Sequence, residues 1–193
     1  MKKITIILLA MLLVASIGQV ASAGASVGAF AGYNIAGKAF SVGLNGEYEF
    51  VNWFSLAGEA EVVIGKFGSG DEIGAVYLFD LEGKFTFLKI GKFNLGTKIF
   101  ATAFVTPGYS SLLFVGPGIY VNATFFEKLK VELEYGCSLL AVNFAAGNVV
   151  FGPIPYFVDL GISYALSNNI SLGIKGKMRI SNVDLGLAFE YKF

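Results

Sequence analysis

Apolar and polar residues alternate along most of this chain, in short segments separated by turn-forming residues. Period-two alternation is typical of β-strands that have one apolar and one polar face, and no helical periodicity is sustained after the N-terminal stretch. On this basis we predict ten strands, at residues 26–35, 41–50, 54–66, 75–87, 93–105, 114–125, 130–142, 156–166, 170–180 and 183–193. The pattern therefore predicts an all-β fold.

The segment at residues 130–142 illustrates the alternation. Leu133 and Tyr135 fall on one face, whereas Glu132 and Glu134 fall on the other. Successive side chains of a strand point to opposite sides of a sheet, so the charged residues of all ten segments gather on one side, with Lys66 as the exception. The charges on this shared polar face are Glu47, Glu49, Glu59, Glu61, Asp80, Glu82, Lys84, Lys98, Lys130, Glu132, Glu134, Asp159, Lys175, Lys177, Arg179, Asp184, Glu190 and Lys192.

The same alternation would suit a soluble β-protein whose apolar face lies inside. Three features favour a membrane barrel with its apolar face outward. The apolar face is continuous through all ten segments, aromatic residues gather near the segment ends, and acidic and basic residues occur together on the polar face. We therefore predict a closed, ten-stranded, antiparallel up-and-down transmembrane β-barrel, with an eight-stranded barrel as the alternative. The aromatic residues near the segment ends are Phe50, Trp53, Phe54, Phe85, Phe87, Phe93, Phe125, Phe126 and Tyr164.

The predicted connections separate into two sets, as they do when short periplasmic turns alternate with longer outer loops. The inner turns are at residues 51–53, 88–92, 126–129 and 167–169, and the outer loops are at residues 36–39, 67–74, 106–113, 145–155 and 181–182. Three of the four prolines, Pro107, Pro153 and Pro155, fall in or beside predicted loops. Pro117 lies within a predicted strand, and because proline has no ladder donor it indicates a bulge or a frayed strand start there.

The N-terminal stretch differs from the rest of the chain. Lys2 and Lys3 precede an apolar run at residues 4–17, and Ala21 and Ala23 form a small-x-small cleavage pattern. This is the organisation of a secretory signal peptide. We predict that residues 1–23 are removed after Ala23 and that residues 24–193 form one transmembrane barrel domain.

Composition agrees with a membrane barrel. Apolar residues make up 55% of the chain, and the mean hydropathy is +0.67. After the N-terminal stretch, however, no run of about 18 apolar residues exists to form a membrane helix. Loss of Lys2 and Lys3 leaves 12 basic against 14 acidic groups, which argues against nucleic acid as a partner. The single cysteine, Cys137, cannot form an internal disulfide and is interpreted as a wall residue.

The C-terminal segment carries a resemblance to a known family. Phe189, Tyr191 and the final Phe193 stand at alternate positions. Together with the signal peptide and the alternating strands, this ending resembles the small bacterial outer-membrane β-barrel proteins over the whole mature length. The resemblance implies Sec-type export, insertion among outer-membrane lipids, and recognition of these three aromatic residues by the barrel-assembly machinery.

No catalytic constellation is evident. The chain contains no histidine, whereas the barrel-type proteases, phospholipases and deacylases that share this architecture rely on a histidine base, so an enzyme is disfavoured. Residues 68–74 lack the spacing of a phosphate loop, and Asp71 and Glu72 there have no further ligands spaced for Ca²⁺. We predict no catalytic, cofactor or metal site, although a carboxylate cluster around Glu59 and Glu61 is an alternative cation site.

The polar face instead predicts a charge network inside the barrel. We expect Lys175, Lys177 and Arg179 to reach across the lumen to the acidic second, third and fourth strands and to plug it. The predicted network comprises Glu47, Glu49, Glu59, Glu61, Asp80, Glu82, Lys84, Lys98, Glu132, Glu134, Lys175, Lys177 and Arg179.

These features predict a structural outer-membrane protein or a narrow porin-like passage for small solutes. The alternative is an adhesin or receptor that binds through the outer loops at residues 67–74 and 145–155.

Overall fold

The computed structural model describes residues 24–35, 37–66, 73–107, 111–179 and 182–193. The predicted signal peptide, with Ala21 and Ala23, and residues 67–72 of the predicted second outer loop lie outside the described residues. No helix within the described part of the chain is long and apolar enough to cross a bilayer.

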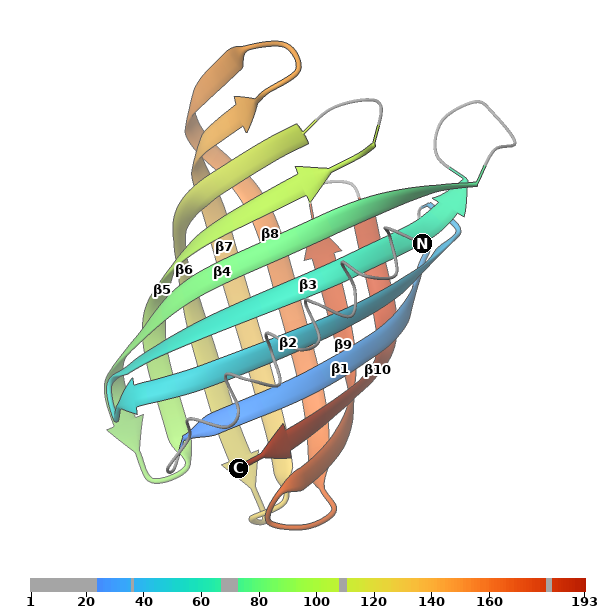
Figure 1. Cartoon of the computed structure of the whole chain (residues 1–193). Coiled ribbons are helices and arrows are strands. Elements are labelled where there is room, and N and C mark those ends of the chain that lie inside the picture. The colour runs from blue at the N-terminus through green and yellow to red at the C-terminus, as the bar shows by residue number, and fades with distance from the viewer. Residues whose placement is uncertain (1–23, 36, 67–72, 108–110, 180–181) are drawn as a thin grey trace.

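Ten strands form one closed barrel (Figure 1). Each strand pairs antiparallel with its sequence neighbours, and β1 pairs with β10 to close the sheet. The predicted ten-stranded barrel is confirmed, and the eight-stranded alternative is wrong. The strands are β1 (Ala25–Asn34), β2 (Ala39–Val51), β3 (Phe54–Lys66), β4 (Ile73–Ile90), β5 (Phe93–Val105), β6 (Ser111–Phe125), β7 (Leu129–Asn143), β8 (Asn148–Ala165), β9 (Ile170–Arg179) and β10 (Asn182–Lys192).

Most large apolar residues of the strands face outward, as predicted. Leu133 and Leu187 on the outer face are 46% and 70% exposed, whereas Glu61 on the inner face is buried. Cys137 is a free thiol in the wall. Because a bilayer is apolar, this sidedness matches hydrocarbon outside and ionised groups inside.

The barrel wall is taller on one side than on the other. β9 has 10 residues and β8 has 18, and at about 3.3 Å per residue a tilted strand of roughly 10 residues already crosses a bilayer. β8 pairs with β9 only from Phe157 onward. We call the end of the barrel that carries the predicted outer loops the loop end, and the opposite end, with the short turns, the turn end. Residues 148–156 therefore extend past the loop end of β9, and the β7–β8 hairpin rises above the neighbouring rim (Figure 1).

This hairpin corrects the predicted outer loop at residues 145–155, which is mostly strand. Pairing of β7 with β8 continues to Asn143 and Asn148, and the turn between them contains Gly147 at φ 64°. Pro153 and Pro155 were expected in a loop but lie in β8. The β7–β8 register shifts near both of them, so the missing proline donors fall where the ladder is already interrupted.

Pro117 behaves as predicted. The β6–β7 register shifts between Val115 and Gly118, which places the proline at a bulge. On its other side Pro117 still lies opposite Ile99 of β5. The bulge therefore accommodates the proline without opening the barrel wall.

Candidate functional site: the barrel lumen

An aromatic cluster fills the lumen toward the loop end. The Tyr156 ring of β8 stacks on Phe100 of β5, with centroids 5.3 Å apart, and on Phe114 of β6, at 4.8 Å. Phe157 meets Phe100 edge to face at 5.1 Å. All four side chains are buried, and Phe104, Leu112 and Ala141 pack against them. We call Phe100, Phe114, Tyr156 and Phe157 the aromatic cluster.

A bulge in β8 accounts for two consecutive aromatic residues pointing inward. Phe157 pairs with Gly136 and Pro155 with Cys137, so Tyr156 is the extra residue of β8 at this point. An extra residue reverses the alternation locally, so Tyr156 and Phe157 are both buried. The space that the two rings need is available because Gly136 has no side chain beside Phe157.

Two cationic side chains of β9 connect opposite walls of the barrel. The Lys177 ammonium pairs with Glu59 and Glu61 of β3, the second at 2.8 Å. The Arg179 guanidinium reaches Asp80 of β4 at 3.2 Å, and β4 lies five strands from β9 around the closed sheet. Ion pairs therefore span the lumen.

A second group of ion pairs lies on the β4 to β7 side. The Lys84 ammonium lies 3.4 Å from Glu47 and 3.1 Å from Glu134. Lys98 pairs with Glu82 at 2.7 Å and also with Glu134. The Lys98 side chain is fully buried, and its ammonium lies 4.4 Å from the centroid of the Phe157 ring, which links this group to the aromatic cluster.

Toward the turn end the lumen is hollow. It contains two cavities of about 140 Å³ each, which share Glu47, Lys84, Lys130, Glu132 and Glu134 in their lining. The second cavity reaches Asn52 in the β2–β3 turn. We call the two cavities together the vestibule.

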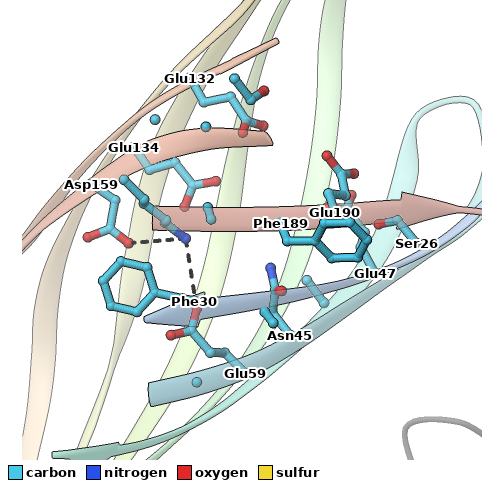
Figure 2. Close-up of a pocket in the computed structure, with 18 of the residues that line it drawn as sticks. Ser26, Phe30, Asn45, Glu47, Glu59, Glu132, Glu134, Asp159, Phe189 and Glu190 are labelled. Carbon is cyan, nitrogen blue, oxygen red and sulfur yellow. Dashed lines mark ion pairs between the residues drawn. The ribbon is translucent and has the colours of Figure 1, made fainter. Parts of the chain in front are cut away.

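The deep part of the vestibule is lined by charges from several strands. Figure 2 shows the carboxylates of Glu59 and Asp159 facing one another, with Glu132 and Glu190 elsewhere around the same space. The Lys175 ammonium lies between the first two, 3.8 Å from Glu59 and 4.0 Å from Asp159. The vestibule is therefore polar along its length, in contrast to the aromatic cluster.

The predicted network residues all lie on strands with their charges toward the lumen, but they do not form one group. Glu132 pairs with Lys130 at 2.6 Å near the turn end. Glu49 lies exposed at the turn end of β2 and makes no ion pair within the described residues. Within the same part of the chain, no three acidic or sulfur-bearing side chains are placed to hold one metal ion.

Sequence reasoning missed two parts of the site. The predicted network does not include Asp159 and Lys130, although both share the polar face and their charges are visible in the alternation. The aromatic cluster carried no such signal, because large aromatic residues on the polar face look like irregularities until the strands are brought together.

Comparisons with known proteins bear on the fold. No protein-family model and no curated protein sequence is significantly similar to this chain. Among solved structures, the outer membrane protease OmpT from Escherichia coli is similar with a TM-score of 0.55 at 10% identity, covering 88% of this chain and 94% of that one. The NanC porin is similar with a TM-score of 0.52 at 9% identity, covering 86% of this chain and all of the other. The chain therefore has the fold of the outer-membrane β-barrel proteins.

Proposed function

We propose that this protein is an integral outer-membrane barrel with a closed lumen, a structural membrane protein instead of an open porin. The outward apolar face supports the location, because the wall offers hydrocarbon-compatible side chains all around the barrel. The signal peptide predicted at residues 1–23 supplies the export step. We propose no catalytic activity, since the chain has no histidine.

The observation that carries the closed lumen is the stacking of Tyr156 on Phe100 and Phe114. These rings come from three strands and meet within the barrel, where a solute would have to pass. An ion that enters such an apolar constriction loses water without gaining a polar partner, which is costly. The cross-lumen pair of Arg179 with Asp80 narrows the same half further.

Planar-bilayer conductance tests the proposal. The wild-type protein should show no large, steady open state. A Phe100→Ala/Tyr156→Ala variant should show a measurable leak, because two of the stacked rings are gone. Phe151→Ala, which removes an aromatic ring that is 78% exposed on the β7–β8 hairpin, is the matched control and should stay closed. A steady wild-type conductance of porin size would refute the closed lumen.

A second candidate function is binding at the surface through the β7–β8 hairpin. Phe144, Val149, Val150 and Phe151 are between 51% and 78% exposed, and no charged residue occurs at residues 138–158. Exposed apolar groups beyond the membrane rim are typical of contact surfaces. Replacing residues 144–151 by a Gly-Ser turn should abolish whole-cell binding of a partner while heat-modifiable gel migration shows that the barrel still folds.

A further inference from the structure

The charged side chains of the lumen differ in how far they are exposed to solvent. The Lys98 and Lys177 side chains have no exposure at all, whereas those of Glu47 and Glu132 are 40% and 39% exposed. The deeper cavity, which reaches Asp159, is lined by eight carboxylates and four basic side chains. Lys98 and Lys177 pair with Glu82, Glu134 and Glu59 of this lining, so six cations face its eight carboxylates and the vestibule keeps an excess of two negative charges.

The vestibule already holds alkylammonium groups of its own. The Lys84 ammonium lies among Glu47, Glu82 and Glu134, at 3.4, 3.7 and 3.1 Å, and these carboxylates come from three different strands. The Lys175 ammonium lies between Glu59 and Asp159. Each lysine shows that a primary ammonium on an aliphatic stem fits between these walls.

A buried carboxylate oxygen at the closed end of the cavity lacks a hydrogen bond. Asp159 is 6% exposed and lines the cavity, and its Oδ1 atom accepts no hydrogen bond within the described residues. Its contact with Arg179 is a long one, 3.5 Å to Nη1. An unsatisfied buried acceptor favours a ligand that brings its own donors.

The spacing of the carboxylates selects the kind of cation. No three of them are placed to share one metal ion in the described part of the chain. They are instead spread around the vestibule (Figure 2), and Glu132 and Glu190 lie nearer to the turn ends of their strands than Asp159 does. A flexible chain with several ammonium groups matches this spacing, because each group can pair with a separate carboxylate.

We propose that the vestibule binds linear polyamines, which enter from the turn end and align along its acidic wall. This inference rests on the proposed closed lumen, since a blind vestibule retains a ligand that an open pore would pass. The Lys84 and Lys175 sites show the recognition chemistry. Within the described residues, Glu132 and Glu190 each use one carboxylate oxygen in an ion pair, with Lys130 and Lys192. Their second oxygens are the acceptors for an added ligand.

Calorimetric titration of the folded full-length mature protein in detergent with spermidine tests the proposal. Saturable binding is expected, stronger than that of putrescine because spermidine has one more ammonium group. Glu132→Gln/Glu190→Gln should weaken it about tenfold or more. Glu127→Gln, which changes an 84% exposed carboxylate in the β6–β7 turn, is the matched control and should bind like the wild type.

Ser26→Lys provides an independent variant if the double change prevents folding. Ser26 lines the cavity next to Glu47, its partner on the neighbouring strand. A lysine at this position supplies a competing ammonium group and should also weaken the binding of spermidine. Absence of saturable binding, or equal competition by MgCl₂ at matched ionic strength, would overturn the inference. Because calorimetry does not depend on conductance, a conducting wild-type protein would refute the closed lumen alone, whereas a closed protein without spermidine binding would refute the polyamine site alone.

Discussion

Side chains in the loop half of the lumen are buried, as stacked aromatic rings or as ion pairs such as Lys177 with Glu61, whereas the charged side chains in the turn half reach water. Tyr156 is 2% exposed among its stacked rings, while the Glu132 side chain is 39% exposed in the vestibule. Eight strands already give an interior that side chains just fill, so ten leave space to be occupied. Here large rings occupy that space at one end, and two cavities of about 140 Å³ each remain at the other. The comparison indicates that the two ends of one small barrel can be filled in different ways.

The largest effect that would test this contrast is expected at Lys177. Lys177→Ala leaves the carboxylates of Glu59 and Glu61 without their buried ammonium, and breaking a buried pair in this way costs about 3–5 kcal/mol. The cation–π contact of Lys177 with Phe30, at 4.4 Å, is lost as well. Urea unfolding of vesicle-inserted protein measures the change.

Lys177→Met is the informative companion to that variant. It keeps the aliphatic stem against Phe30 but removes the charge, so its destabilisation should remain close to that of Lys177→Ala if the ion pairs dominate. An unfolding midpoint equal to wild type in both variants would mean that the loop half of the lumen is as wet as the turn half.

A smaller effect is expected for a charge placed on the other side of the wall. Leu133→Arg faces lipid and should cost roughly 2–4 kcal/mol near the bilayer midplane and reduce assembly. Its strand neighbour Glu132 faces the vestibule, so Glu132→Gln should fold normally. Gel migration with and without boiling in SDS reports assembly, and equal behaviour of the two variants would contradict the assignment of the faces.

The alternation was sufficient to predict the strands and which face of each strand is charged. β3 and β5 begin and end as expected, because no proline interrupts the alternation in either of them. It was not sufficient for the hairpin, where Pro153 and Pro155 indicated a loop. The β-bulges that accommodate these prolines depend on the partner strand, and a single strand's sequence does not contain that information.

The candidate site shows the same division. The polar face and the number of strands predicted that Lys177 reaches the acidic second to fourth strands, but not which carboxylates it meets. Its partners Glu59 and Glu61 lie more than 110 residues away, and the stagger of the closed sheet selects them. The inward position of Tyr156 could not be predicted, because the extra residue in β8 reverses the alternation at that position. The face on which a side chain lies can be predicted from the local alternation. The residue that it meets across the lumen depends on how the whole sheet closes.

The smallest effect is expected in the turn half, at Lys130. Its side chain is 26% exposed beside Glu132, so the ion pair is screened by water in the vestibule and should contribute about 1 kcal/mol or less. Lys130→Gln should therefore unfold in urea close to wild type. Because salt screens solvent-accessible pairs far more than buried ones, raising KCl to about 1 M should erase the remaining difference for Lys130→Gln but leave most of the difference for Lys177→Ala. Equal salt sensitivity of the two variants would contradict the division of the lumen into a dry half and a wet half.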